Sequence, residues 1–300
     1  MTDYTSHVFI TGITGYIGGS VARKLQAQGY RVSGLVRRES DLQWLRSQGM
    51  DGLVGTIHQT GILEAAVSQA STIIHTADSA DDPYAVDTFL RLLEGTGKTF
   101  LFTSGSAIFG GKENGEANSF VYTEDFPLEP RLEMASRVLI NNTILRSAQR
   151  GVRSIVMVPT MVYGEGLGRK KDSIQLPALV TYSKEKGHGV YFGKGANIWS
   201  NLHIEDLADL YILAMQRARA GSIYYAENGW STLKDLAENI SDRLGLQPAR
   251  SVSIQEAVER FGPAGGYFGF ASNSFCSADK ARRELAWAPQ YSSIVPFIQR

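Results

Sequence analysis

The feature that most constrains this 300-residue chain is a glycine-rich stretch near its beginning, HVFITGITGYIGGS at residues 7–20. Gly12, Gly15 and Gly18 lie where a run of strand-forming residues gives way to a run with helical character. A strand that turns tightly into a helix leaves free backbone N–H groups and the positive end of the helix beside the turn. Because glycines let a ligand approach that backbone closely, the stretch predicts a pyrophosphate-binding turn.

The glycine turn heads a regular alternation of strand-like and helix-like segments. The predicted strands are His7–Thr11, Arg31–Val36, Gly52–Gly55, Thr72–Thr76, Thr99–Thr103 and Ser154–Pro159. The predicted helices between them are Tyr16–Gln28, Asp41–Ser47, Ile62–Gln69, Pro83–Glu94 and Leu132–Arg150. Such alternation is typical of a parallel sheet with helices on both faces and right-handed crossovers. The predicted fold class is α/β, a Rossmann-type doubly wound parallel sheet of six strands with a smaller C-terminal substrate lobe.

Two stretches interrupt this alternation. A long polar loop, Gly105–Pro130, follows the fifth strand, and loops of this length are usually functional or disordered. A stretch rich in glycine and lysine, Tyr163–Ser173, opens a more mixed C-terminal half. Further helices are predicted there at Glu205–Gln216, Leu233–Leu244, Ile254–Phe261 and Ala278–Leu285. We expect residues 1–165 to form the dinucleotide-binding domain, residues 198–220 to return to it, and residues 166–300 to form mainly the substrate lobe.

The tip of the second strand bears on which nicotinamide dinucleotide is bound. In the common fingerprint, an acidic residue about 20 residues after the turn binds the ribose 2′-hydroxyl of NAD. Here the strand ends in Arg37 and Arg38. A carboxylate would repel a 2′-phosphate, whereas a guanidinium pairs with it bidentately. We therefore expect NADP(H) as the preferred cofactor, while Glu39 leaves NAD(H) open; the alternative is that the arginines are a solvated surface pair.

The composition narrows the range of partners and compartments. Thirty basic and thirty acidic residues cancel, so the charge indicates neither nucleic acid nor an anionic membrane as partner. No apolar run approaches the ~20 residues of a membrane helix, and MTDYTSHV lacks the features of a signal peptide. The single cysteine, Cys276, favours a reducing compartment, and the five histidines show no metal-ligand spacing. We expect a cytoplasmic monomer or homodimer that takes a small-molecule substrate and no metal.

Six segments carry a resemblance to a known superfamily. They are TGITGYIGG, HTAD, FLFTSGSAIFGG, VPTMVYGEG, NLHIEDLADLYILA and ARRELAWAP. Their order resembles that in extended short-chain dehydrogenase/reductases, which include epimerases, dehydratases and dihydroflavonol-type reductases. The likeness covers nearly the whole chain, and it implies a Rossmann domain that binds NAD(P) and a lobe that closes over a substrate.

The resemblance also implies cofactor contacts by position. Those implied for the pyrophosphate are Gly12, Thr14, Gly15, Tyr16, Ile17 and Gly18. Those implied for the adenosine and ribose side are His75, Thr76 and Ala77, and those for the nicotinamide are Thr103 and Pro159 to Val162. Asp206, in HIEDLADLY, is interpreted as a structural hydrogen-bonding residue rather than a catalyst.

The chain departs from the superfamily at the residues that carry its chemistry. The superfamily uses Tyr-x-x-x-Lys at the start of the helix after strand five, where the lysine helps to lower the pKa of the proton-exchanging tyrosine. Counting back from Gly151, that tyrosine is expected near Arg131 or Leu132. The lysine is expected near Ala135 or Ser136, but the segment reads EPRLEMASRVLI and contains neither residue type. The pattern resembles an atypical branch that keeps the nucleotide site and lacks this pair.

Other side chains are candidates to supply an acid or an electrophile. Ser104 and Ser106, where the superfamily has Thr-Ser-Ser, could donate a hydrogen bond to a substrate oxygen. Tyr122 on the long loop offers a phenol, but no lysine is placed to lower its pKa, so a structural role is the alternative. Arg131 is suited to bind a carboxylate or to polarise a carbonyl, or else it is a solvated arginine at a helix start.

Four further residues are candidates for lining the substrate site. They are Tyr163 after the sixth strand, Tyr191 and Trp199 in GVYFGKGANIWS, and His203 before the helix predicted at 205–216. For each, a place in the packed core is the alternative, because aromatic and histidine side chains serve equally well there.

Three functions are compatible with these residues. The first is an NADP(H)-dependent oxidoreductase acting on a small carbonyl, alcohol or enone with a non-standard acid or water; an enone needs the least help, because solvent can protonate the enolate. The second is an epimerase, dehydratase or isomerase on the same scaffold. The third is a non-catalytic NADP(H) sensor, since a fold does not specify a function. The long loop and the aromatic-rich lobe favour a small-molecule pocket, which ranks the sensor third.

Overall fold

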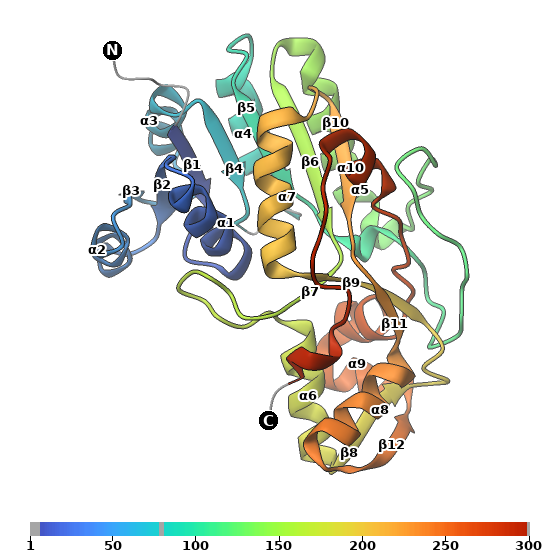
Figure 1. The fold of residues 1–300 in the computed structure, drawn as a ribbon. Helices are drawn as coiled ribbons and strands as arrows, with labels where there is room; N and C mark the ends of the chain where they lie inside the picture. Colours follow the sequence, from blue (N-terminus) through green and yellow to red (C-terminus); the bar gives the residue numbers. More distant parts are fainter. Residues whose placement is uncertain (1–6, 78–80, 299–300) are drawn as a thin grey trace.

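The core of the molecule is a seven-stranded parallel β-sheet. In the computed structural model, which describes residues 7–77 and 81–298, the strand order is β10-β6-β5-β4-β1-β2-β3 (Figure 1). The strands are β1 (His7–Thr11), β2 (Arg31–Val36), β3 (Asp51–Val54), β4 (Thr72–His75), β5 (Thr99–Thr103), β6 (Arg153–Pro159) and β10 (Ser222–Ala226). From β1 the strand order runs outward in one direction through β2 and β3 and in the other direction through β4, β5 and β6. This reversal of strand order between β1 and β4 confirms the predicted Rossmann-type fold. The prediction of six strands was wrong by one, because β10 joins β6 from the C-terminal half, a long-range pairing that local sequence does not encode.

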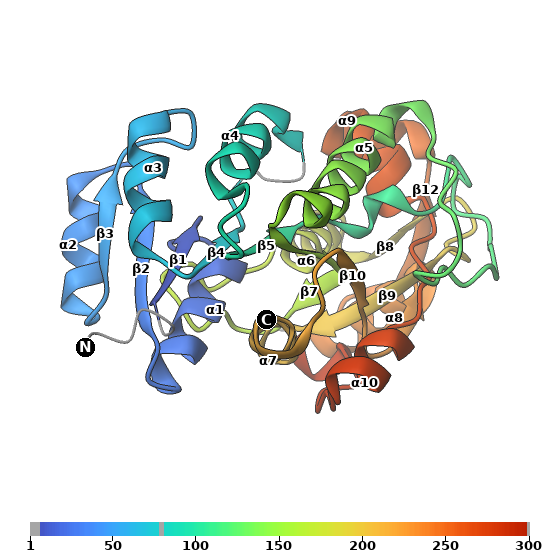
Figure 2. The ribbon, with the colours of Figure 1, turned by 90° about the horizontal axis from the view of Figure 1, so that it is seen from above.

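Helices cover both faces of this sheet (Figure 2). One face carries α1 (Tyr16–Ala27), α7 (Ile204–Arg217) and α10 (Asp279–Leu285). The other carries α3 (Thr60–Gln69), α4 (Pro83–Leu93) and α5 (Leu132–Arg146), while α2 (Glu39–Ser47) packs beside β3. Because both faces are covered, β1, β4 and β5 are buried along their whole length, as is typical of parallel strands. None of the helices in the described ranges combines the length and the apolar character that a bilayer crossing requires.

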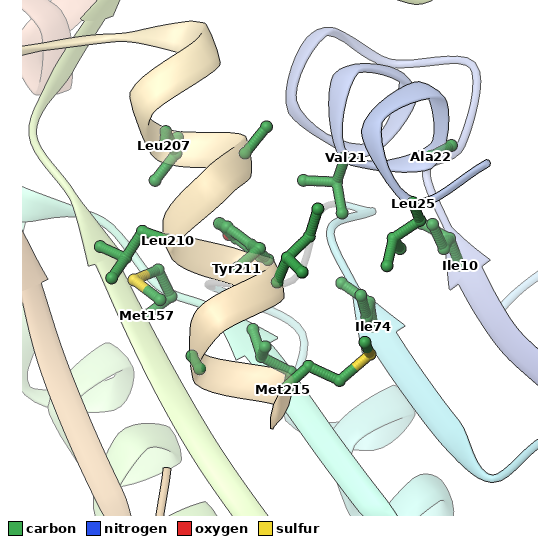
Figure 3. Packing of buried hydrophobic residues seen from close by; sticks show 14 of the residues in the cluster. Ile10, Val21, Ala22, Leu25, Ile74, Met157, Leu207, Leu210, Tyr211 and Met215 are labelled. Atoms are coloured by element: carbon green, nitrogen blue, oxygen red, sulfur yellow. The ribbon is translucent and has the colours of Figure 1, made fainter. Parts of the chain in front are cut away.

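The core on the α1 side joins segments that are far apart in the sequence. Leu210, Tyr211 and Met215 of α7 share one buried cluster with Val21 of α1 and Met157 of β6 (Figure 3). Residues 198–220 thus contribute a helix that packs against the same sheet as the N-terminal half. This packing holds α1, and the glycine turn before it, in a fixed position on the sheet.

A smaller lobe lies beyond the carboxyl ends of the parallel strands (Figure 1). Its helices are α6 (Gln175–Lys186), α8 (Leu233–Leu244) and α9 (Ile254–Pro263), the last followed by a π-helical segment, Ala264–Phe270. Its strands are β7 (Met161–Tyr163), β8 (His188–Phe192), β9 (Ile198–His203), β11 (Trp230–Thr232) and β12 (Gln247–Val252). They form a three-stranded sheet, β11-β9-β7, and a two-stranded sheet, β12-β8, around a separate apolar core. Sequence analysis did not predict α6, whose first turn contains Pro177.

Candidate functional site

A cavity of about 1150 Å³ opens at the carboxyl ends of the parallel strands. Residues that follow β1 to β6 line it. It therefore covers at least the four strand spacings between β2 and β6, about 19 Å, and also reaches the residues that follow the edge strand β3. Ligands of open parallel sheets bind in this crevice, where the strand order reverses. The volume exceeds the roughly 300–1,000 Å³ of most small-molecule sites, which leaves room for a dinucleotide together with a second small molecule.

The glycine turn forms one wall of this cavity with its backbone. Gly12 has φ +71°, and a Cβ built on Gly18 would lie 2.4 Å from Thr76 Oγ1 and 2.5 Å from Gly12 O. No side chain caps the N-terminus of α1, so the N–H groups of its first turn are open to the cavity. All the residues implied for the pyrophosphate line the cavity: Gly12, Thr14, Gly15, Tyr16, Ile17 and Gly18. Because helix starts of this kind stabilise anions, these residues fit the diphosphate of a dinucleotide.

The residues implied for the adenosine side fall into two groups. Thr76 and Ala77 line the cavity. His75 is fully buried beneath it, with Nδ1 at 2.6 Å from Thr11 Oγ1 and its ring against Phe89. Burial lowers the pKa of His75 to about 4, so the ring is neutral at neutral pH. His75 therefore supports the turn from below.

The stretch 163–173 lies across the start of α1. A Cβ built on Gly168 would lie 2.6 Å from Gly19 Cα, so the two segments touch backbone to backbone. This close approach brings Arg169 and Lys170 into the lining of the cavity. Sequence analysis missed both residues, because their position depends on a contact between segments more than a hundred residues apart.

The end of the cavity at β2, called the β2 end below, is positively charged. Arg37 and Arg38 are exposed and line it, and neither forms an ion pair with any residue in 7–77 or 81–298. Arg169 lies at the same end and pairs with Asp41 of α2. Glu39, which left NAD(H) open, does not belong to the lining. The free guanidinium groups at this end are therefore those of the two predicted arginines.

The opposite end of the cavity, called the β5–β6 end below, is formed by small and polar residues. Gly105, Ser106 and Ala107 line it after β5, and Pro159 and Val162 line it from the side of β6. The two ends therefore lie on opposite sides of the glycine turn.

Two of the predicted hydroxyl groups lie beneath the surface of the β5–β6 end. Thr103 Oγ1 is 2.6 Å from the Tyr211 hydroxyl, and both residues are buried. Ser104 is buried as well, and its Oγ has no hydrogen-bond partner in the part of the chain that the structure describes. Of the residues in the Thr-Ser-Gly-Ser segment that carry a hydroxyl, Ser106 is the one in the lining.

Tyr122 and Arg131 face the loop that follows β5. Arg131 donates to backbone carbonyls of that loop, including those of Ala107 (2.7 Å) and Phe109 (2.9 Å). The Tyr122 hydroxyl accepts a hydrogen bond from Gly110 N (3.1 Å), and its ring stacks on Phe109. Neither side chain belongs to the lining of the cavity, and both hold the loop in place. Their assignment to catalysis stays a prediction.

The four candidates for substrate lining pack in the core of the lobe. Trp199 and Tyr163 are buried, and the Tyr163 hydroxyl donates to Tyr291 O (3.2 Å). His203 stacks on the Tyr291 ring at 3.8 Å, and Tyr191 is half-buried against the same core. None of the four belongs to the lining of the cavity. Their contacts are those of residues packed in the core, which was the alternative to a place in the substrate site.

Asp206, interpreted from the sequence as a structural residue, ties α7 to the last part of the chain. Its carboxylate accepts hydrogen bonds from the N–H groups of Gln290 (2.8 Å) and Tyr291 (2.9 Å). Burial raises the pKa of this carboxyl, and the two hydrogen bonds oppose the rise. These contacts are those expected of a structural hydrogen-bonding residue.

Comparison with known proteins identifies the family to which this site belongs. Residues 8–226 match the model of the NAD dependent epimerase/dehydratase family. The chain belongs to this family. An uncharacterized protein of Schizosaccharomyces pombe is 33% identical over 307 residues, which cover 96% of each chain.

Two further proteins extend the likeness. The oxidase ucsJ of an Acremonium species is 25% identical, over 95% of this chain and 93% of that protein. The solved structure of a dTDP-glucose 4,6-dehydratase from Bacillus anthracis, in complex with NAD, is similar with a TM-score of 0.76 and 19% identity, over 98% of this chain and 95% of that one. The chain is an NAD(P)-dependent enzyme of the epimerase/dehydratase family.

In this member of the epimerase/dehydratase family, α5 contains neither tyrosine nor lysine. The residue of α5 that lines the cavity is Arg137, in the second turn, and it lies at the β5–β6 end. Its Nε and Nη2 donate to the two carboxylate oxygens of Asp81, at 2.9 and 2.5 Å. Sequence analysis missed Arg137, although it stands one residue beyond Ser136, where the lysine is expected. A search for a basic residue within one position of the expected lysine would have found Arg137.

Proposed function

We propose that this protein is an NADP(H)-dependent oxidoreductase that acts on a small organic carbonyl, alcohol or enone without a Tyr-x-x-x-Lys pair. The observation that carries the proposal is one continuous cavity that joins the glycine turn to unpaired arginines at the tip of β2. When bound, the nicotinamide would supply or accept a hydride. The protein's own contribution is to hold the dinucleotide and to bind the substrate oxygen.

Different parts of the cavity would hold different parts of the cofactor. The turn from Gly12 to Gly18 and the first N–H groups of α1 would hold the diphosphate. Arg37 and Arg38 would hold the 2′-phosphate, since each guanidinium offers a planar fork of donors. Thr76 and Ala77 would lie beside the ribose, and Pro159 to Val162 beside the nicotinamide. Residues 1–165, with α7 returning to them, would act as the dinucleotide-binding domain.

The charge of the lining supports a ligand with several phosphates. Among the described residues, the cations of the lining are Arg37, Arg38, Arg137, Arg169 and Lys170. Its carboxylates are Asp41 and Asp82. Each carboxylate already has a basic partner, Asp41 in Arg169 and Asp82 in His58 at 2.7 Å. Arg137 is paired with Asp81, so the lining cations without a carboxylate partner among the described residues are Arg37, Arg38 and Lys170. Their charge favours NADP(H), which carries one phosphate more than NAD(H).

The name of one relative supports redox chemistry, whereas the name of the family supports an epimerase or a dehydratase. The Acremonium relative is described as an oxidase. The alternative is an epimerase, dehydratase or isomerase, which returns its cofactor to the starting state. The absence of tyrosine and lysine from α5 disfavours any reaction that depends on that pair for proton exchange. A non-catalytic sensor of NADP(H) is the remaining possibility from the sequence.

Titration with NADPH and NADH, followed by cofactor fluorescence, tests the proposal. We expect NADPH to bind more tightly. The double variant Arg37→Ala, Arg38→Ala should lose about tenfold to hundredfold in NADPH affinity, since a charged hydrogen bond contributes about 1.5–3 kcal/mol. Its NADH affinity should change little. Arg219→Ala, an exposed arginine outside the cavity, is the matched control; equal wild-type affinities for the two cofactors would contradict the preference.

A panel of carbonyls, alcohols and enones, monitored at the nicotinamide absorbance, separates the three functions. Net oxidation or reduction of the cofactor supports the oxidoreductase. Conversion of a substrate with no net change in the cofactor would indicate the epimerase or dehydratase class. Tight binding of NADPH with no conversion across the panel would indicate a sensor.

We also propose a cytoplasmic location. The single cysteine, Cys276, is buried, and burial raises the pKa of its thiol, so it stays protonated and unreactive. A chain that makes no use of its thiol is suited to a reducing compartment. A monomer or a homodimer remains the expectation for its assembly.

A further inference from the structure

Arg137 puts a cation at the β5–β6 end of the cavity, where Ser106 is the candidate donor already in the lining. It projects from the second turn of α5 and lines the β5–β6 end. Gly105, opposite it, has an extended backbone (φ −169°) that any residue adopts. A Cβ built on Gly105 would lie 3.7 Å from Arg137 Nη1. Because no side chain occupies that space, the guanidinium is open to a ligand from this side.

Asp81 fixes the orientation of this guanidinium. Its two carboxylate oxygens accept from Nε and Nη2, which form one bidentate edge of the arginine. The second edge, formed by the remaining N–H groups of Nη1 and Nη2, is not used by Asp81. The Arg137 side chain is 16% exposed, whereas that of Asp81 is 66% exposed, so solvent reaches the carboxylate while the arginine lies mostly within the protein. Nη1, which belongs to this second edge, lies beside Gly105 of the lining, in space that no side chain fills.

We propose that the second edge of Arg137 binds the carbonyl oxygen of the substrate, with Asp81 as a positioning residue. The inference rests on the proposed function and names the substrate class as conjugated carbonyls, that is, enones. An arginine keeps its protons at any working pH, so it stabilises negative charge on an oxygen without protonating it. Ser106, in the same lining, offers that oxygen a second donor.

Reduction of an enone suits a site with these properties. The enone gains a hydride at its β-carbon at the expense of NADPH, which is thereby oxidised to NADP⁺. A C–H bond of the reduced nicotinamide would break as the C–H bond at the β-carbon forms, and the electron pair of the C=C π bond would move to the carbonyl oxygen, giving an enolate held by Arg137. Water would then protonate the α-carbon, which re-forms the C=O bond, leaves hydroxide and gives the saturated ketone. No tyrosine donor is required at any point, in agreement with the composition of α5.

A binding experiment tests this role without requiring turnover. The probe is para-nitrophenol, whose yellow phenolate resembles an enolate because its charge lies on an oxygen conjugated to a ring. We expect wild-type protein, with or without NADP⁺, to bind the phenolate and to increase the yellow absorbance. Arg137→Met should weaken this binding by roughly 100-fold, the effect of removing an oxyanion donor. Arg146→Met, at an exposed position of the same helix outside the cavity, should bind as wild type does.

Two further variants separate positioning from folding. Arg137→Lys keeps the charge but loses the planar fork, so we expect it to fold and to bind the phenolate less tightly than wild type but more tightly than Arg137→Met. Asp81→Asn leaves Arg137 without its charged partner, and we expect a weakening smaller than that of Arg137→Met. With cyclohexenone as substrate, Arg137→Met should lose kcat, while its KM for NADPH and its NADPH affinity stay at the wild-type value.

The outcomes distinguish this inference from the proposed function. Phenolate binding that survives in Arg137→Met, or that is absent from the wild type, would overturn the role of Arg137. Failure of the wild type to bind NADPH would instead refute the proposed function, and the phenolate experiment in the absence of cofactor would still decide the role of Arg137.

Discussion

The two ends of the cavity differ in which parts of the chain line them. Around the β2 end, the lining comes mainly from the backbone of the glycine turn and from Arg37 and Arg38 at a strand tip, and the stretch 163–173 adds Arg169. At the β5–β6 end, they come from side chains on a loop and on α5, and one of them, Arg137, is oriented by Asp81 from another segment. A site made of backbone and strand ends is largely local, whereas a site made of side chains depends on how distant segments pack.

The largest expected effect comes from damaging the backbone-built end alone. In Gly18→Ala the new Cβ would lie 2.5 Å from Gly12 O, so the turn must move away from its position. We expect NADPH affinity to fall by roughly 100-fold, the cost of displacing a binding geometry by about 1 Å. Cofactor fluorescence measures the loss, and phenolate binding at the β5–β6 end should persist.

Gly61→Ala provides the matched control for this prediction. Gly61 lies in α3, and a Cβ there meets no atom within 4 Å. This variant should keep its NADPH affinity and gain about 0.5–1 kcal/mol in the free energy of unfolding, because alanine is the better helix former. If Gly18→Ala bound NADPH as tightly as Gly61→Ala does, the turn would not be the diphosphate site.

A smaller effect is expected from low pH, which lowers the free energy of unfolding by protonating His75 beneath the glycine turn. Burial lowers the pKa of His75 to about 4, against about 6.5 in an unfolded chain. Between these values the unfolded chain binds more protons than the folded one, so stability is present above pH ~6.5 and is lost as the pH falls toward ~4. His75 should therefore cost about 2 kcal/mol in the free energy of unfolding between about pH 7 and about pH 5. Denaturant unfolding at several pH values measures it.

His75→Asn isolates this contribution. Asparagine carries no titrating group, and it keeps a polar side chain beside Thr11. The loss of stability on acidification should be smaller in this variant than in the wild type by about 2 kcal/mol. Parallel pH profiles for the two proteins would show that His75 does not titrate in this range.

The smallest expected effect is that of removing the Tyr122 hydroxyl, which tests whether Tyr122 has a structural or a catalytic role near the β5–β6 end. Tyr122→Phe removes the acceptor of one hydrogen bond from Gly110 N, so we expect the free energy of unfolding to fall by about 1 kcal/mol. Turnover should persist, because the hydroxyl lies outside the lining of the cavity. Tyr84→Phe, at a side chain that is 80% exposed, is the control and should leave stability unchanged. A loss of turnover in Tyr122→Phe greater than its loss of stability would make that phenol the acid considered from the sequence.

The sequence predicted most of the sheet because buried parallel strands are continuous apolar runs with sharp ends. The bounds of β1, β2 and β5 are those predicted from the sequence. β10 was missed because its place on the sheet depends on pairing with β6, far away in the chain. Local pattern carries no information on such a pairing.

Within the site, the same distinction separates the residues that were found from those that were missed. The glycines and the arginines at the tip of β2 follow from the order strand, turn and helix. The arginine proposed for the substrate was sought at Arg131, whose guanidinium binds the loop after β5, whereas Arg137 lines the cavity. Arg131 has an extended backbone before the first turn of α5, whereas Arg137 lies in the second turn, so the two side chains leave the chain in different directions.

The sequence by itself determined the Rossmann-type fold, the family, the glycine turn that lines the cavity, and the charge at the tip of β2. Only the tertiary structure decided which face of α5 meets the cavity, that Asp81 orients Arg137, and that Tyr163, Trp199 and His203 are packed in the lobe. The physical reason is that backbone geometry follows from residues that are neighbours in the chain. The direction and partners of a side chain follow from the packing of elements that meet only in the folded molecule.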